Sequence, residues 1–366
     1  VKEEEHILVM SKINGMKFSK FYIKDIDLEL EKWIGKSLRK EEAKEITDVD
    51  EVNFKSQFNS DIHKMITMKD EINLYLDLER MSADTEGTIS HKFANEMMSK
   101  YPQIRVNNIY SKIGELRLKK SPQEVEKIKK AIEITKSGIE KLMTECRSGM
   151  KEYELEAYFD FNCKIKGATD LAFTTIAAAG KNATTLHYVE NNSKLKDGDL
   201  ILFDLGAEYN CYNADITRTF PISGKFTERQ KEVYNSVLKV NEEIINLIKP
   251  GMKYKDINEK ATDLIAEECI KLGLIKDKSE VRKYYYHSIG HSLGMDTHDI
   301  ETPHRDIIFE PGVVFTVEPG IYIQEEGIGI RIEDDILVTN EGVINLSSDI
   351  IKSVDDIENF MDKFTK

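Results

Sequence analysis

Apolar residues recur at helical spacing through much of the second part of the chain. The clearest run begins at Pro122, with apolar side chains at 125, 128, 132, 139 and 142. Ser121 and Pro122 are favoured residue types for the N-cap and the first position of a helix, so this helix should begin there. The same pattern predicts helices over 122–146, 152–166, 227–248, 254–272 and 353–364.

Two segments between these helices have the pattern of antiparallel hairpins. The first spans Leu200 to Pro221 and the second spans Val313 to Val338, and in each a polar turn joins two apolar runs. Two helices and a hairpin therefore occur twice in the same order. We expect two halves related by an approximate two-fold axis.

The N-terminal part has shorter patterns. Strand-like runs occupy 6–10, 17–24 and 72–78, and helix-like runs occupy 28–44 and 94–100. Near 113–122 these short runs give way to the long helical pattern that begins at Pro122. The sequence thus predicts a small α/β domain over 1–115 and a larger α/β (α+β) domain over 116–366.

Composition narrows the class of partner. The 366 residues have a formal net charge of −14, spread along the chain, which disfavours nucleic acid and anionic membranes as partners. No apolar run approaches the ~18 residues of a membrane span, and the opening VKEEEH lacks the apolar core of a secretion signal. The chain also opens without an initiator methionine, from which we expect the gene product to begin further upstream.

The four cysteines are far apart and form no CxxC pair. They are Cys146, Cys163, Cys211 and Cys269. This usage predicts free thiols in a reducing compartment, and hence a cytoplasmic location.

Two aspartates flank the turn of the first hairpin. If the strands pair about Tyr209 and Asn210, then Asp204 and Asp215 lie directly opposite each other, with Cβ atoms ~5 Å apart. Two carboxylates at that distance repel each other unless they share a proton, solvent or a cation. We interpret the pair as ligands of cations.

The second hairpin repeats this arrangement with glutamates. Glu318 and Glu333 are symmetric about its turn at 325–326, so they should also be cross-strand partners. Pro319 cannot donate a hydrogen bond to a neighbouring strand, which predicts a bulge or an edge position there. Each half of the domain then supplies two carboxylates from apolar strand sequence.

His291 adds one imidazole to the four carboxylates. Four negative charges balance two divalent cations, and this oxygen-rich set suits Mn²⁺, Fe²⁺ or Co²⁺ better than a closed tetrahedral zinc site. Two such metals ~3.5–4 Å apart can bridge one water and generate a hydroxide nucleophile near neutral pH. His187, His287 and His298 are expected to lie around the metals or to contact substrate.

Four segments resemble the signature segments of the pita-bread metallopeptidases, which include methionine aminopeptidase, prolidase and aminopeptidase P. They are DLGAEYNCYNADITRTFPISGKFT, HSIGHSLGMDTHD, TVEPGIYI and GIRIEDDILVT. The resemblance covers about residues 113–350 and is strongest to aminopeptidase P, through LHYVEN around His187 and through ELRLKKSPQEVEKIKKAIEIT. The N-terminal part resembles that family's creatinase-type amino domain from its middle onward, so its first strands and helix are expected to be absent.

The resemblance implies a role for each residue of the set. Asp204 would chelate one metal, Asp215 and Glu333 would bridge both, and His291 and Glu318 would hold the second. Around the metals, His187 and His298 would bind substrate and stabilise the transition state. His287 would line the proline pocket, and Arg331 would orient Asp204. Glu318 is in addition a candidate to transfer a proton to the leaving proline nitrogen.

The implied activity is removal of an N-terminal residue from peptides whose second residue is proline. The implied cofactors are two divalent ions, Mn²⁺ before Co²⁺, Fe²⁺ or Zn²⁺, and the implied assembly is a homodimer. Two alternatives remain. A prolidase would perform the same chemistry on dipeptides, and the short connection 324–329 is shared with some prolidases. A catalytically silent pita-bread binding protein is the other.

Overall fold

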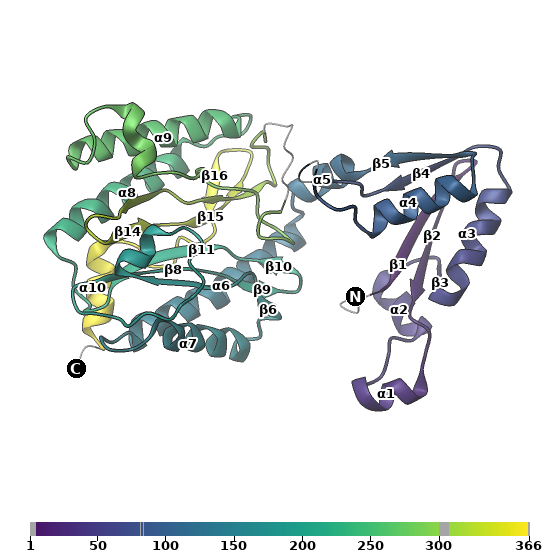
Figure 1. The fold of residues 1–366 in the computed structure, drawn as a ribbon, viewed down its shortest axis with the longest axis horizontal. Helices are drawn as coiled ribbons and strands as arrows, with labels where there is room; N and C mark the ends of the chain where they lie inside the picture. Colours follow the sequence, from purple (N-terminus) through teal and green to yellow (C-terminus); the bar gives the residue numbers. More distant parts are fainter. Residues whose placement is uncertain (1–4, 81, 83, 300–306, 365–366) are drawn as a thin grey trace. The chain divides into compact units, whose positions relative to one another are not determined.

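The structure is a computed structural model that describes residues 5–80, 82, 84–299 and 307–364 (Figure 1). The chain forms two compact units, Val1–Tyr110 and Ser111–Lys366. Among the described residues, no helix is long and apolar enough to cross a membrane.

The first unit contains a three-stranded and a two-stranded sheet. Its elements are β1 (Ile7–Ile13), β2 (Met16–Ile23), α1 (Leu28–Ile34), α2 (Lys40–Thr47), β3 (Glu51–Phe54), the 3₁₀ turn Lys55–Gln57, α3 (Phe58–Thr67), β4 (Ile72–Leu76), α4 (Ile89–Lys100) and β5 (Ile104–Asn108). Strand β2 pairs antiparallel with β1 and parallel with β3, and β4 pairs parallel with β5. The helix predicted over 28–44 is two helices, because Gly35 has a φ of +92° that ends α1.

The second unit contains the two predicted hairpins. Its helices are α5 (Tyr110–Leu118), α6 (Pro122–Glu145), α7 (Glu152–Ile165), α8 (Glu228–Leu247), α9 (Tyr254–Lys271) and α10 (Val354–Asp362), with 3₁₀ turns at Gly180–Thr184 and Lys278–Lys283. Its strands are β6 (Asp170–Leu171), β7 (Ile176–Ala179), β8 (Leu200–Leu205), β9 (Ala207–Tyr209), β10 (Tyr212–Asn213), β11 (Ile216–Pro221), β12 (Val314–Val317), β13 (Gly320–Ile323), β14 (Ile328–Arg331), β15 (Asp334–Val338) and β16 (Val343–Asn345). Figure 1 shows the strands between two helix pairs, α6 with α7 on one face and α8 with α9 on the other.

Local sequence signals explain why α6 begins where it does. The Ser121 hydroxyl accepts from the Glu124 backbone N–H, and the Glu124 carboxylate accepts from the Ser121 N–H at 2.6 Å. The apolar positions of α6 that were predicted from the sequence are buried; they are Val125, Ile128, Ile132, Ile139 and Leu142. The predicted helix is confirmed.

The turn of the first hairpin lies one residue later than predicted. Asn210 and Cys211 both have positive φ, at 49° and 67°, as the two central residues of a type I′ turn must. Tyr209 consequently pairs with Tyr212 across the turn. The predicted turn at Tyr209 and Asn210 is therefore wrong.

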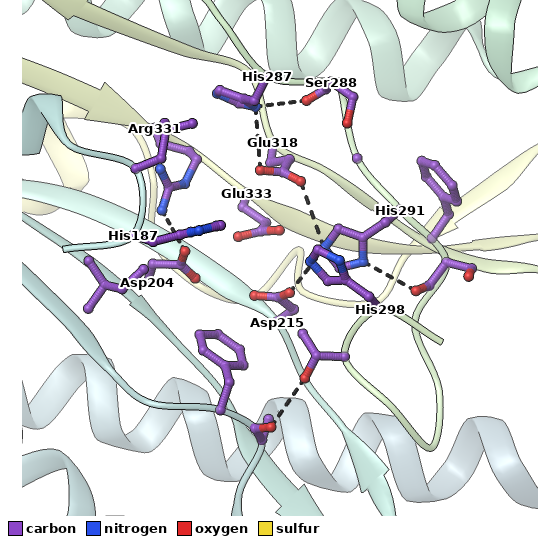
Figure 2. Close-up of a pocket in the computed structure, with 18 of the residues that line it drawn as sticks. His187, Asp204, Asp215, His287, Ser288, His291, His298, Glu318, Arg331 and Glu333 are labelled. Atoms are coloured by element: carbon purple, nitrogen blue, oxygen red, sulfur yellow. Dashed lines mark hydrogen bonds and ion pairs between the residues drawn. The ribbon is translucent and has the colours of Figure 1, made fainter. Parts of the chain in front are cut away.

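This turn shifts the register of the hairpin by two residues. Asp204 pairs with Thr217, and Leu205 pairs with Ile216, so Asp204 does not lie directly opposite Asp215 as predicted. A shift of two residues keeps each side chain on its face of the sheet. Asp204 and Asp215 consequently both line the same cavity, as Figure 2 shows.

Cys211 is expected to be suboptimal for this turn. Glycine at the second central position of a type I′ turn adopts positive φ without a Cβ clash, so Cys211→Gly should raise the free energy of unfolding by ~0.5–1 kcal/mol. Urea unfolding measures this change. Cys211→Ala is the matched control, because it removes the thiol and keeps the Cβ. Equal stability of the glycine and alanine variants would show that backbone strain is not the cause.

The second hairpin has the predicted register. Val317 pairs with Asp334 and Gly320 pairs with Arg331, which leaves Glu318 and Glu333 opposite each other between these pairs. The chain leaves strand conformation at Glu318 and Pro319, so the hairpin is divided into two short sheets at the two glutamates.

Hydrogen bonds join the two hairpins at their centres. The Glu333 N–H donates to the Thr217 carbonyl at 3.1 Å, and the Thr219 hydroxyl donates to the Arg331 carbonyl at 3.1 Å. The strand that follows Asp215 and the segment around Glu333 are thereby held side by side. Of the four bonded residues, Arg331 and Glu333 line a cavity.

Candidate active site

A cavity of about 1170 Å³ opens where the two hairpins meet. Its lining includes all of the residues predicted from the sequence for the site: His187, Asp204, Asp215, His287, His291, His298, Glu318, Arg331 and Glu333. Figure 2 shows their side chains converging from both hairpins and from the connecting segments. Positions separated by more than a hundred residues in sequence are thus brought together.

Three of these side chains form a compact group of possible metal ligands. One atom each from Asp215, His291 and Glu333 lies within 4.8 Å of the other two. His291 Nε2 is 3.3 Å from the Asp215 carboxylate and 3.8 Å from that of Glu318. Its Nδ1 faces the carbonyl of the next residue at 3.2 Å, which leaves Nε2 directed at the carboxylates.

Asp204 and Glu318 flank this group on different sides, as Figure 2 shows. One oxygen of Asp204 accepts from Arg331. Its other oxygen, Oδ1, is buried and accepts no hydrogen bond from any residue that the structure describes. A buried carboxylate oxygen without a donor is costly, and a cation would satisfy it.

The electrostatics of the protein chain alone are unfavourable to this cluster. Burial, followed by the charge of Glu333, raises the pKa of Asp215 well above its usual value, and the same two causes raise the pKa of Glu318. Burial and the charge of Asp204 raise the pKa of Glu333 to about 7. Carboxylates that repel each other in this way, with an imidazole among them, fit a group of divalent cations.

Arg331 is fixed by three hydrogen bonds. It donates through Nε to the Thr217 hydroxyl at 3.1 Å, through NH1 to the Tyr322 hydroxyl at 3.1 Å, and through NH2 to Asp204. The Thr217 hydroxyl in turn donates to Glu333 at 2.7 Å. Arg331 and Thr217 therefore orient one carboxylate from each hairpin.

Thr217 and Tyr322 were not among the site residues predicted from the sequence. Thr217 stands two residues after Asp215, on the same face of its strand, so the period-two rule could have identified it. Tyr322 gave no comparable signal, because an apolar-flanked tyrosine in a strand is ordinary core sequence.

His287 is held as a neutral ring. Its Nδ1 faces the Ser288 carbonyl at 2.8 Å and must donate to it, so Nε2 accepts from the Tyr322 hydroxyl at 2.8 Å. Burial, and then the charge of Arg331, lowers the pKa of His287 to about 3. Arg331 thus connects Asp204 to His287 through Tyr322.

His298 packs against the metal-ligand candidate His291, with ring centroids 4.0 Å apart. The residue that follows, Asp299, is buried and pairs with Lys120 at 2.9 Å and with Arg117. The Asp299 N–H also donates to the Ser292 carbonyl at 3.0 Å, which fixes the backbone beside His298. His187 lines the opposite part of the cavity, next to Asp204 in Figure 2.

Comparison with models of known protein families identifies the family of this chain. The model described as "Metallopeptidase family M24" matches residues 126–340, more than half of the 366 residues.

The chain belongs to metallopeptidase family M24.

It is therefore a metallopeptidase, and a second model, described as "Aminopeptidase P, N-terminal domain", matches residues 1–75.

Relatives match this M24 chain over nearly its whole length. The Xaa-Pro aminopeptidase of Escherichia coli is 34% identical over an alignment that covers 98% of this chain and 86% of that protein. Xaa-Pro aminopeptidase 3 of Homo sapiens is 34% identical over an alignment that covers 98% of this chain and 74% of that protein. The structure of aminopeptidase P from E. coli with the inhibitor Pro-Leu has a TM-score of 0.90 at 34% identity, covering 100% of this chain and 87% of that one. The expected pita-bread fold with an amino domain is confirmed.

Proposed function

We propose that the protein is an Xaa-Pro aminopeptidase, which removes the N-terminal residue from peptides whose second residue is proline. The observation that carries the proposal is a complete set of four carboxylates and one histidine in a single large cavity. The chain that holds this set matches Xaa-Pro aminopeptidases over 98% of its length. A catalytically silent relative would have no need to keep such a repulsive cluster together.

The metal ligands we propose are Asp204, Asp215, His291, Glu318 and Glu333, holding two divalent ions. Oxygen-rich ligation with one imidazole favours Mn²⁺, with Co²⁺, Fe²⁺ and Zn²⁺ as alternatives. When bound, such ions lower the pKa of a water molecule and polarise the scissile carbonyl. Arg331 and Thr217 hold Asp204 and Glu333 in place for this role.

The protein's own groups would bind and protonate the substrate. An Xaa-Pro bond is a tertiary amide without an N–H, so a proline-directed site must recognise the ring instead. His287 suits this task, because its neutral ring lines the cavity and Tyr322 and Ser288 fix its orientation. Glu318, 3.7 Å from His287, is placed to move a proton to the proline nitrogen.

His187 and His298 would act on the carbonyl side of the scissile bond. Both line the cavity, and neither belongs to the proposed ligand set. An imidazole N–H directed at the developing oxyanion stabilises the transition state more than the substrate. We assign this role to the two histidines jointly.

The cavity favours a peptidase that accepts more than dipeptides. Its volume of about 1170 Å³ is above the usual range of sites for drug-sized ligands, which extends to ~1,000 Å³. Prolidase activity is the alternative. The proposal also includes a homodimer, testable by light scattering, and a cytoplasmic location, which the four free cysteines support.

A peptide panel tests the proposal. Gly-Pro-Leu should be cleaved to glycine and Pro-Leu by the Mn²⁺-loaded protein, while Gly-Ala-Leu is cleaved at a rate lower by about tenfold or more. Mass spectrometry of the products measures this, with a chelator-treated sample as control. If the protein cleaves the dipeptide Gly-Pro but not Gly-Pro-Leu, it is a prolidase. If it cleaves no peptide, the alternative of a catalytically silent binding protein is supported.

A further inference from the structure

Glu152 is a carboxylate buried in the second unit, outside the cavity. It is the first residue of α7 and is 0% exposed. The hydrogen bonds that its side chain makes to other described residues all come from neutral donors. Burial of an unpaired charge is expensive, so a position of this kind calls for a specific reason.

Four donors surround this carboxylate, and all four come from one segment. Oε1 accepts from the Ala179 N–H at 2.8 Å and from the Asn182 side-chain amide at 3.0 Å. Oε2 accepts from the Tyr188 hydroxyl at 2.9 Å and from the Ser193 N–H at 2.8 Å. Glu152 therefore fastens both ends and the middle of the segment 179–193.

The N-terminus of α7 strengthens this attachment. The Glu152 N–H donates to the Ser193 carbonyl at 3.0 Å, and the Tyr153 N–H donates to the Asn191 carbonyl at 2.7 Å. The positive end of the helix dipole also favours the buried negative charge. The carboxylate therefore needs no cation beside it, and the donors of the segment 179–193 occupy its four acceptor positions.

His187 lies in the part of this segment that has least support of its own. Residues 186–190 make no backbone–backbone hydrogen bond to another described residue and belong to no helix or strand. The Tyr188 hydroxyl, one residue after His187, is bound to Glu152. The residue next to the imidazole is thus bound by a carboxylate that does not itself line the cavity.

We propose that Glu152 is the positioning residue for His187. By binding Ala179, Tyr188 and Ser193 together, it holds the segment so that the His187 ring faces Asp204 in the cavity. The positioning role itself does not depend on the proposed peptidase function. Only the expectation that a misplaced His187 slows turnover rests on that function.

Glutamine at position 152 cannot replace the carboxylate. Each oxygen accepts two donors, so the amide NH₂ of a glutamine would face either Ala179 and Asn182 or Tyr188 and Ser193. The hydroxyl of Tyr188 can turn, but a backbone N–H cannot. One end of the segment is released in either orientation.

The experiment compares Glu152→Gln with Glu268→Gln. Glu268 is also a buried glutamate, 7% exposed, but it pairs with two lysines, Lys239 of α8 and Lys271 of α9. Glu152→Gln should lower kcat for Gly-Pro-Leu by about 10- to 100-fold with unchanged metal content, whereas Glu268→Gln leaves kcat unchanged. In a His187→Ala background, Glu152→Gln should change kcat by less than about twofold, because the two act as a unit.

A second readout does not depend on catalysis. In protein labelled with ¹⁵N-histidine, the His187 signal, assigned by its loss in His187→Ala, should shift or broaden in Glu152→Gln and remain in place in Glu268→Gln. Tyr188→Phe removes one of the four donors and should displace the same signal less, which carries the test if Glu152→Gln does not fold.

Two results would overturn the inference: an unchanged His187 signal, or equal loss of kcat with and without His187. If the wild-type protein cleaves no peptide, the proposed function fails, and the histidine signal still decides the role of Glu152.

Discussion

Asp215→Asn is expected to lower kcat/KM for an Xaa-Pro peptide by on the order of 10³, because it removes a ligand worth several kcal/mol of charge stabilisation. Asp215 lies against both His291 and Glu333 in the group of possible ligand atoms. Asparagine keeps the size of the side chain and loses one negative charge. Steady-state kinetics and elemental analysis should show the losses of activity and of metal together.

The same substitution should stabilise the metal-free protein. Burial, and then the charges of Glu333, Asp204 and Asp335, raise the pKa of Asp215, so the metal-free protein must take up a proton there on folding, and asparagine removes that requirement. We expect Tm after chelation to rise by a few degrees, since about 1 kcal/mol shifts Tm by ~2 °C in a unit the size of Ser111–Lys366. Asp197→Asn, at an exposed position outside the cavity, is the control. A variant that keeps full metal content, or loses Tm after chelation, would contradict the ligand assignment.

The second large effect is the pH dependence of stability without metal. Folding raises the pKa of Glu333 from 4.5 to about 7 and raises those of Asp215 and Glu318 in the same direction. The folded protein therefore holds protons that the unfolded chain has released above pH 4.5. The stabilisation is fully present below pH 4.5 and is lost as the pH rises through about 7, at roughly 1.4 kcal/mol per unit of pKa shift.

Metal should reverse this trend. The ligands must lose their protons to bind, so the gain in Tm from added Mn²⁺ should grow between pH 5 and pH 8. Differential scanning calorimetry of chelated and Mn²⁺-loaded protein over this range gives both curves. Asp215→Asn should flatten the metal-free curve. A metal-free Tm that rises steadily with pH would show that the carboxylates do not repel each other as described.

The two hairpins show how well strand register could be predicted from the sequence. The second register was predictable because a symmetric turn and Pro319 leave one natural pairing. The first was displaced because Asn210 and Cys211 occupy positions of positive φ, and cysteine in place of glycine there gives no turn signal. The displacement is an even number of residues, so Asp204 and Asp215 remained on the cavity face and the predicted carboxylate set survived.

Contacts between distant segments account for what the sequence did not reveal. Glu152 begins an amphipathic helix, where an acidic residue is ordinarily a solvated partner of the helix dipole. Its burial arises from the segment 179–193, which no local pattern connects to α7. Tyr322 likewise acquires its role only because Arg331 and His287 meet at its hydroxyl.

Titration of the chelated protein with Mn²⁺, with hydrolysis of Gly-Pro-Leu followed at each addition, tests whether the carboxylate and histidine cluster is a two-metal catalytic site. We expect no hydrolysis without metal and a rate that reaches its maximum at two equivalents of Mn²⁺ per chain. Full activity in the metal-free protein, or two bound equivalents without hydrolysis, would contradict it.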